Sequence, residues 1–426
     1  MADIHQLAQM FKELDDQLVN CMRCGMCQAV CPMFAQTGRE ADVARGKIAL
    51  LEGLASEMLS DPEGVNEKLN RCLVCGTCQA NCPSGVKVMD IFLKARAIMT
   101  GYFGLSPVKK AIFRGLLKNP KLFNTLVGMG SKFQGLFTKR QDELLGSSCA
   151  RFNAPIIADR HFNSLASKPL HKIVPELDTP AGKSGIKVAL YVGCVIDKIF
   201  PHVGQAVLDV LEYHGVGVFM PKGQACCGIP VLSSGDTDTF NSLVGMNVDL
   251  FREGEFDYLV TACASCTSTI KELWPSMYSG PSARKYDIGV LQAKTMDISQ
   301  FLVDVLKVTP RTGAGKTVTY HDPCHLKNGL GITAQPRELI RAAGCEFKEM
   351  NEAGTCCGNG GSFNLAHYEL SKKIGSRKAD NVVASGADTV ATSCPACMMQ
   401  LTDMLSRKNA GIGVKHVIEL YAEGCR

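Results

Sequence analysis

Hydrophobic residues at helical spacing dominate the first hundred positions of the chain. Near the N-terminus they recur every three or four residues, which is typical of an amphipathic helix: Ile4, Leu7, Phe11, Leu14 and Leu18. Two further helical stretches are predicted, from Val43 to Leu59 and from Val88 to Met99. The pattern therefore predicts a small, mostly helical domain over residues 1–100.

The next segment, residues 101–140, predicts one or two basic amphipathic helices. It contains eight Lys or Arg residues and no acidic residue, in a chain with a net charge of +5. Five phenylalanines accompany the charge, so we expect this face to dock on a partner or on an anionic membrane surface, in preference to being a solvated arm. No nucleic-acid-reading motif is present, which argues against nucleic-acid binding. Residues 146–183 contain four prolines and predict an irregular linker, so residues 101–183 are treated as one region.

The remaining residues contain an internal repeat of about 120 residues. In each copy, β-branched apolar runs alternate with helical patterns, which indicates βαβ units on a parallel sheet. The copies are predicted to span residues 184–309 and 310–426, and to close on helices at Ile298–Val308 and Val414–Ala422. Because ligands gather at the carboxyl ends of parallel strands, residues that follow these strands are candidate site residues.

Composition indicates a globular protein of two to four domains. Apolar residues make up 46% and charged residues 20% of the 426 residues. No secretory leader and no apolar run long enough to span a bilayer are apparent, so we expect a cytoplasmic protein. In that compartment the 21 cysteines favour metal chemistry over a secreted disulfide scaffold.

Two identical cysteine quartets lie in the N-terminal domain. Each reads Cys-x-x-Cys-x-x-Cys-x-x-x-Cys-Pro, the spacing of two-cluster ferredoxins, in which the fourth cysteine binds the other cluster. Two [4Fe–4S] cubanes are therefore predicted, one bound by Cys21, Cys24, Cys27 and Cys82 and the other by Cys72, Cys75, Cys78 and Cys31. Structural zinc is the alternative, but zinc sites normally use two ligand pairs separated by a longer spacer. Met26 and Thr77 are expected to help shield the clusters.

Each C-terminal copy contains a Cys…Cys-Cys-Gly…Cys-x-x-Cys motif, with 32 positions from the first cysteine to the pair in both copies. Five thiols exceed the four that tetrahedral zinc or a simple cubane requires, which favours an unusual cluster; zinc bound by four of the five is the rival. The glycine after the pair suggests a close backbone approach or a positive φ. The candidate ligands are Cys194, Cys226, Cys227, Cys263 and Cys266 in the first copy, and Cys324, Cys356, Cys357, Cys394 and Cys397 in the second.

These motifs together resemble a known family. The tandem Cys-Cys-Gly region looks like the catalytic subunit of heterodisulfide reductase. Its fusion to a two-cluster module is similar to the iron–sulfur subunits of glycolate oxidase, of D-lactate dehydrogenases and of anaerobic glycerol-3-phosphate dehydrogenase. The resemblance implies a multidomain protein, with an α-helical ferredoxin module followed by a pseudo-twofold tandem α/β repeat with parallel sheets. It also implies that each set of five cysteines holds a non-cubane [4Fe–4S] cluster. Cys149, Cys345 and Cys425 are left over as ordinary thiols.

The resemblance implies an electron-transfer subunit of a 2-hydroxy-acid dehydrogenase that oxidises D-lactate or glycolate. An FAD-containing subunit or an electron-transfer flavoprotein would supply electrons, and quinone or a membrane redox partner would accept them. No dinucleotide fingerprint occurs, so flavin and NAD are expected on a partner and no catalytic residue is assigned here. His321 and His325 flank Cys324 and are expected to be structural more often than proton relays. The alternatives are a thiol–disulfide reductase, and a membrane-anchoring subunit for glycerol-3-phosphate oxidation in which the basic segment lies on the inner face of the cell membrane.

Overall fold

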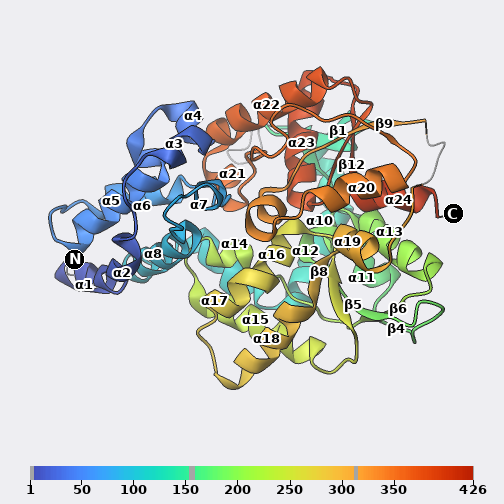
Figure 1. Cartoon of the computed structure of the whole chain (residues 1–426), viewed down its shortest axis with the longest axis horizontal. Helices are drawn as coiled ribbons and strands as arrows, with labels where there is room; N and C mark the ends of the chain where they lie inside the picture. The colour runs from blue at the N-terminus through green and yellow to red at the C-terminus, as the bar shows by residue number, and fades with distance from the viewer. Residues whose placement is uncertain (1–3, 153–158, 311–314, 426) are drawn as a thin grey trace.

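The computed structural model describes residues 4–152, 159–310 and 315–425. Part of the predicted linker, residues 153–158, and residues 311–314 at the start of the second repeat lie outside this range. Figure 1 shows the N-terminal domain on one side of the two α/β domains, against which it packs. Among the described residues, no helix combines the length and the apolar character needed to cross a membrane.

The N-terminal domain is helical, as the hydrophobic pattern predicts, with no strand among residues 4–103. The apolar faces of its helices pack on a core that includes Leu7, Ile48 and Ile91, all 2% exposed or less. The first predicted helix is broken in two after Lys12, the second ends at Ala55 rather than Leu59, and the third extends beyond Met99. The helices are α1 (Ile4–Lys12), α2 (Asp15–Leu18), α3 (Met26–Val30), α4 (Phe34–Thr37), α5 (Ala44–Ala55), α6 (Pro62–Asn70), α7 (Thr77–Ala80) and α8 (Val88–Phe103).

A buried arginine on α8 joins this domain to the first α/β domain. The guanidinium of Arg96 donates to the carbonyl oxygens of Leu69 and Cys72 in its own domain and to that of Ser233, at 2.7 to 2.8 Å. Thr100 Oγ1, one turn later, donates to the carbonyl of Ser234 at 2.9 Å. A buried cation is tolerated only with such partners, so these contacts fix the second cysteine quartet relative to the first repeat.

The basic segment forms α9 (Pro107–Lys110), a π-helical stretch (Ala111–Leu117) and α10 (Pro120–Phe137). The expectation of an irregular linker after it is wrong in part. The mostly polar segment after α10 forms a small antiparallel sheet of β1 (Thr138–Asp142), β2 (Ser147–Ala150) and β3 (Phe162–Asn163). This sheet is followed by α11 (Leu170–Ile173) and β4 (Leu177–Asp178). The buried hydroxyl of Ser147 hydrogen-bonds Ser406 of the second repeat. Such strands have no apolar alternation, so the hydrophobic pattern does not reveal them.

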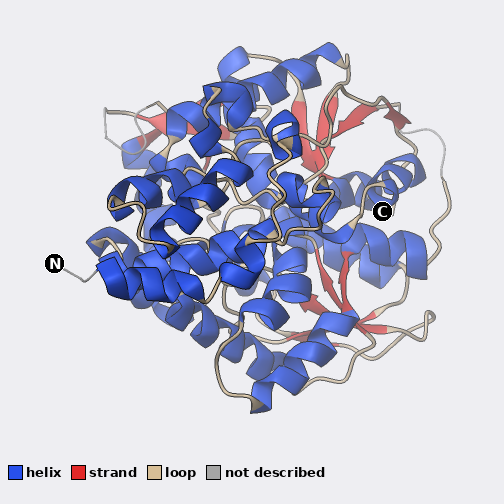
Figure 2. Ribbon diagram, turned by 60° about the vertical axis from the view of Figure 1, so that its left-hand side comes forward, coloured by secondary structure: helices blue, strands red, loops and turns tan. Residues whose placement is uncertain are grey.

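Each repeat contains a sheet of four parallel strands in the same order. In the first they are β6 (Gly217–Met220), β5 (Lys187–Tyr191), β7 (Tyr258–Thr261) and β8 (Thr295–Asp297), and β4 adds an antiparallel edge. In the second they are β10 (Glu346–Phe347), β9 (Thr317–Tyr320), β11 (Thr389–Thr392) and β12 (Gly413–His416). The matching order confirms the predicted tandem α/β repeat, and Figure 2 shows the two sets of strands with helices around them.

The helices of the repeats cover both sheets and bring them onto one core that includes Val188, Val318 and Tyr421. In the first repeat they are α12 (Cys194–Lys198), α13 (Pro201–Tyr213), α14 (Ile229–Leu232), α15 (Thr237–Phe251), α16 (Ala264–Ser268), α17 (Trp274–Met277), α18 (Ala283–Lys294) and α19 (Ile298–Gln300). In the second they are α20 (Ala334–Ala342), α21 (Ser362–Ala366), α22 (Tyr368–Ala384), α23 (Pro395–Lys408) and α24 (Val417–Glu423).

The two predicted closing helices need correction at one end each. The helical turns after Ile298 finish at Val305 rather than Val308. The helix predicted from Val414 begins at Val417, because Val414 belongs to β12, where it is the register partner of Val390 of β11. His416 ends that strand and caps α24, with its Nδ1 accepting from the amide of Ile418 at 3.2 Å.

Candidate iron–sulfur sites

The loops of the two cysteine quartets share an unusual backbone. Before the second cysteine stand Arg23 and Val74, with φ of 56° and 53°, and after it stand Gly25 and Gly76, with φ of 85° and 71°. Left-handed backbone is rare for a β-branched residue such as Val74 and is found where the surroundings impose it. This backbone conformation occurs in both loops and curves each of them around a small hollow, which the thiols line.

Each hollow is lined by four cysteines from both quartets. One is lined by Cys21, Cys24, Cys27 and Cys82, and the other by Cys31, Cys72, Cys75 and Cys78, with Cys78 also bordering the first. Burial raises the pKa of the Cys31 thiol to about 12, so metal cations are needed to hold such thiols as thiolates at neutral pH. The residues present therefore fit a four-iron cluster in each hollow. The ligand sets themselves stay a prediction.

The expected shielding is incomplete at the first hollow. Cys24 is exposed, and Met22 and Met26 are 67% and 56% exposed. Thr77, in contrast, lies beside the second hollow, where its hydroxyl is 3.3 Å from the sulfur of Cys75. The first hollow therefore has a solvent-facing edge where two exposed methionines stand beside the exposed Arg23, whereas the second is covered by the second repeat.

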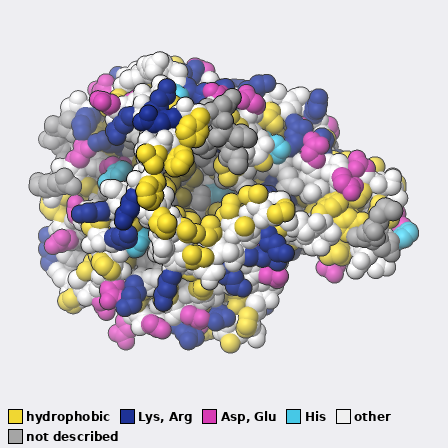
Figure 3. Space-filling model, turned by 180° about the vertical axis from the view of Figure 1, so that it is seen from behind, with side chains coloured by type: hydrophobic (Ala, Val, Ile, Leu, Met, Phe, Trp, Pro, Cys, Tyr) yellow, Lys and Arg dark blue, Asp and Glu magenta, His cyan; other side chains and the backbone are white. Residues whose placement is uncertain are grey.

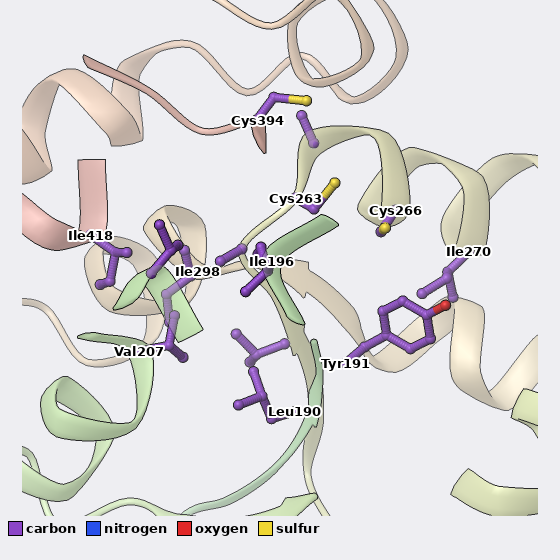
Figure 4. Close-up of a cluster of buried hydrophobic side chains, with 14 of the residues drawn as sticks. Leu190, Tyr191, Ile196, Val207, Cys263, Cys266, Ile270, Ile298, Cys394 and Ile418 are labelled. Atoms are coloured by element: carbon purple, nitrogen blue, oxygen red, sulfur yellow. The ribbon is translucent and has the colours of Figure 1, made fainter. Parts of the chain in front are cut away.

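The ten cysteines of the repeats stand where parallel strands end. In the first repeat, Cys194 follows β5, the adjacent pair follows β6 and Cys263 follows β7; the second repeat places its five equivalently. Figure 4 shows Cys263 at the end of its strand, Cys266 on the helix that follows and Cys394 of the other repeat facing them. The structure thus brings together the five predicted thiols of each copy.

Within each copy, the thiols form a chain of contacts in the same order. In the first copy the order is Cys194, Cys226, Cys227, Cys266 and Cys263, and the sulfurs of Cys194 and Cys226 are 3.8 Å apart. In the second copy it is Cys324, Cys356, Cys357, Cys397 and Cys394, and the sulfurs of Cys357 and Cys397 are 3.5 Å apart. The shared order indicates one ligand arrangement used twice.

Contacts among these thiols raise the pKa of some and lower the pKa of others. Contact with Cys226, reinforced by burial, raises the pKa of Cys194, and contact with Cys227 raises that of Cys266. In the second copy, the hydrogen bond from Cys356 lowers the pKa of Cys357. Four of the five thiols in each copy are buried and the fifth is half-buried. Five thiolates packed so closely can coexist only if cations lie among them, which fits an iron–sulfur cluster in each copy.

Two further contacts join the separate sites. Cys75 of the second quartet packs in one buried cluster with Cys356 of the second repeat, and interaction with that thiol raises the pKa of Cys75. Cys394 of that repeat is in contact with Cys263 of the first repeat, and its sulfur is also 3.6 Å from Ser265 Oγ. The sulfur contacts therefore run without a break from the N-terminal domain through the second repeat to the first. Sequence reasoning missed both junctions, because no local pattern marks them.

The glycine after each cysteine pair has a positive φ, as its position suggests. Gly228 has a φ of 95° and Gly358 a φ of 93°. A Cβ at Gly358 would lie 2.8 Å from the carbonyl oxygen of Ser371, and one at Gly228 would lie 2.6 Å from the ring of Phe240. Both reasons for glycine, conformation and close approach, therefore apply.

The two histidines around Cys324 have different surroundings. His325 Nε2 lies 3.2 Å from the carbonyl oxygen of Val74, and its Nδ1 lies 3.1 Å from Ser265 Oγ, so it touches all three domains. His321 is fully buried, and burial lowers its pKa to about 3. A ring nitrogen of His321 and the sulfurs of Cys357 and Cys397 lie within 4.8 Å of one another. His325 is thus a structural bridge, and His321 is a neutral neighbour of the cysteine site.

Comparison with known proteins agrees with this arrangement. Residues 17–86 match the 4Fe-4S dicluster domain, and residues 188–271 and 318–402 match the cysteine-rich domain. The chain is similar to the probable glycolate oxidase iron–sulfur subunit of Bacillus subtilis, with 29% identity over 99% of this chain and 97% of the relative. It is 31% identical to lactate utilization protein A of Exiguobacterium, over 56% of this chain and 98% of the relative.

A third relative is a subunit of the fumarate reductase (CoM/CoB) of Methanothermobacter marburgensis, with 27% identity over 95% of this chain and 72% of the relative. The fold and the thiol array define an iron–sulfur protein that joins a dicluster domain to two cysteine-rich domains. Within that class, the chain belongs to the family of iron–sulfur subunits that includes lactate utilization protein A and the glycolate oxidase subunit. The resemblance found from the motifs is therefore confirmed.

Proposed function

We propose that the chain is the electron-transfer subunit of a 2-hydroxy-acid dehydrogenase, for D-lactate or glycolate. It takes electrons from an FAD-containing partner and passes them towards quinone or another acceptor. The observation that carries the proposal is the continuous series of sulfur contacts from Cys75 to Cys194. Iron–sulfur clusters held by these thiols supply one-electron carriers, and the chain's own residues place successive carriers in contact.

Electrons are proposed to enter at the first hollow. Cys24 is the exposed member of its quartet, and Met22 and Met26 form an apolar margin beside it. Methionine-rich, partly apolar surfaces adapt well to protein partners. The opposite end of the series, around Cys194, is then where electrons leave.

Isolation of the chain with its flavoprotein tests the proposal. D-Lactate or glycolate is expected to bleach the visible absorbance of the clusters in the co-purified complex, and not in the isolated chain. Cys75→Ser removes a thiol at the junction with the second repeat, so substrate is expected to reduce the first hollow's cluster while the sites in the repeats stay oxidised. Low-temperature EPR distinguishes these centres.

The rival function, thiol–disulfide reduction, gives a different result. If the isolated chain reduces a disulfide with an artificial one-electron donor, and Cys356→Ala abolishes this turnover, the relay proposal is wrong. Cys149→Ser is the matched control, because Cys149 lies on β2, outside the proposed ligand sets. That variant is expected to retain every property of the parent protein.

We also propose that the basic segment rests on an anionic membrane surface. α10 exposes an apolar stripe, and lysines flank it without any acidic residue over 101–140. This combination is complementary to anionic lipid headgroups and the acyl chains below them. The stripe consists of Leu122, Leu126, Met129, Phe133 and Leu136, between 42% and 67% exposed.

Phe133→Glu is expected to weaken retention on vesicles that contain anionic lipid by about tenfold, because one large apolar side chain no longer enters the bilayer. Co-sedimentation measures the effect. Tyr286→Glu, which alters an apolar residue that is 79% exposed on α18, is the control and should bind like the parent. Equal retention of all three proteins would contradict membrane contact.

A further inference from the structure

A hollow beside Cys194 lies at the far end of the sulfur series. It opens to solvent between the basic segment and the first repeat. Cys194 and Cys226 line it together with Leu117 and Phe123 of the basic segment and Val174 after α11. A ligand in this hollow would therefore sit between apolar walls and against two thiols of the first repeat.

Three polar side chains form one hydrogen-bonded group in this hollow. Asp197 accepts from the backbone N–H of His171 at 2.8 Å, lies 2.9 Å from Nδ1 of the same histidine, and accepts from Lys198 Nζ at 2.5 Å. Lys198 is 8% exposed, and its ammonium lies 5.0 Å from the ring centroid of Phe123. An ammonium has three N–H donors, so Lys198 can donate to a ligand oxygen while bound to Asp197.

The hollow continues along α10. A second hollow shares Asn124 and His171 with the first and extends past Met129 and Lys132. Met129 belongs to the exposed apolar stripe of this helix and is 52% exposed. Figure 3, the view from behind, shows hydrophobic side chains gathered on that face with Lys and Arg at their margins. Most residues that line the second hollow are polar, and it borders the exposed apolar stripe of α10 at Met129.

We propose that this hollow binds a quinone, with the ring beside Cys194 and the isoprenoid tail along the exposed apolar stripe of α10. The inference rests on the proposed function, which supplies the electrons. Reduction converts one quinone to a quinol with two electrons and two protons: each carbonyl oxygen gains one proton. The electrons arrive singly through the sites held by the cysteines. Lys198 and His171 donate hydrogen bonds to the ring oxygens and pass on the protons, which solvent replaces.

The chemistry of the walls favours a quinone over other small acceptors. A dinucleotide would require a glycine-rich turn at a helix N-terminus for its phosphates. Here the single Gly193 precedes only the five residues of α12, and Leu117, Phe123 and Val174 form an apolar wall of the hollow. A flat ring with two acceptor oxygens matches an aromatic wall and a small number of donors. The exposed apolar stripe of α10 offers the tail an apolar surface.

The test uses the anaerobically purified full chain, reduced with dithionite and freed of excess reductant. A short-tailed quinone is expected to reoxidise it, as followed by the visible absorbance of the clusters in stopped flow. Lys198→Met removes a charged donor, and is expected to weaken quinone binding and slow reoxidation by about tenfold. Val174→Trp fills the hollow without altering the polar group and should have the same effect. Ferricyanide, which needs no pocket, should reoxidise all forms equally.

A second measurement does not depend on turnover. A photoreactive azidoquinone is expected to label peptides that contain residues 117–124 or 170–175, as located by mass spectrometry, and excess unlabelled quinone should prevent this. Lys121→Met, an exposed lysine on the same helix, is the matched control and should keep parental rates and labelling. Labelling elsewhere, or parental rates in both pocket variants, would overturn the quinone site.

The outcomes separate this inference from the proposed function. If dithionite does not reduce the protein, or if ferricyanide does not reoxidise it, the result contradicts the electron-transfer function itself. Protein that cycles between dithionite and ferricyanide but ignores quinone contradicts only the quinone site. If quinone reoxidises the Val174→Trp and Lys198→Met variants at the parental rate, the electrons leave the protein at another site. This result also contradicts only the quinone site.

Discussion

Anaerobically purified protein is expected to contain about sixteen irons per chain, four for each of the two hollows in the N-terminal domain and four for each cysteine-rich site. The physical reason is that eighteen cysteines converge on four places, where burial and mutual contact make thiolates unfavourable without metal cations. Iron analysis with low-temperature EPR gives the count and the cluster types. About eight irons would mean that only the cubanes are present.

Single substitutions assign the iron to places in the chain. Cys24→Ser is expected to remove about four irons from the first hollow, and Cys397→Ser about four from the second repeat. Cys149→Ser is expected to lose none. Zinc in one cysteine-rich site would appear in the same analysis as one zinc in place of four irons. Equal iron in Cys397→Ser and in the parent would exclude Cys397 as a necessary ligand.

The sequence was sufficient to predict the domains' architecture, because the relevant signals are local. A cysteine quartet specifies its loop through spacing alone, and the repeat is visible because the first cysteine and the pair stand 32 positions apart in both copies. Strands β5 and β9 have apolar runs that end shortly before a cysteine. Since parallel strands end on one edge of a sheet, convergence of the five thiols follows from the topology.

The joins between domains could not be predicted, because they depend on tertiary packing. Cys75 meets Cys356 across 281 positions of the chain, and no local pattern marks this meeting. In the sequence Arg96 is one of several polar residues on α8, beside Asp90 and Lys94, yet it holds two domains together. The group of His171, Asp197 and Lys198 likewise combines two segments, and α11 lies in a region without a hydrophobic pattern.

The surroundings of the first hollow, which shares Cys78 with the second hollow, and of Cys194 at the far end of the sulfur series also bear on the direction of electron flow. Exposed methionines lie at the first hollow, whereas a hydrogen-bonded polar group lies in the hollow beside Cys194. A protein partner requires a broad accessible surface, whereas a small acceptor requires a hollow with a few polar groups. These two places are therefore suited to different partners, which supports flow from a flavoprotein at the first hollow to a small acceptor beside Cys194.

Gly358→Ala is expected to destabilise the protein by about 3 kcal/mol, as the strain of a positive φ adds to an overpacked contact. The new methyl group would lie 2.8 Å from the carbonyl oxygen of Ser371, whose hydroxyl already donates to the carbonyl of Gly358 at 2.8 Å. The backbone must shift, and Cys356 and Cys357 shift with it. Thermal unfolding is expected at a lower temperature, together with a loss of about four irons from the second repeat.

Gly386→Ala separates the two causes of the expected destabilisation, which are backbone strain and close packing. Gly386 has a φ of +65°, but a Cβ there would meet no atom within 4 Å, so this variant carries the backbone strain without the contact. It is expected to lose only about 1 kcal/mol and to keep its iron. Gly228 has a positive φ like that of Gly358, and a Cβ there would meet the ring of Phe240. Gly228→Ala should therefore lower the iron content of the first repeat and leave that of the second unchanged. If Gly358→Ala unfolds like Gly386→Ala and retains all its iron, close packing against the cysteine pair is not what requires glycine there.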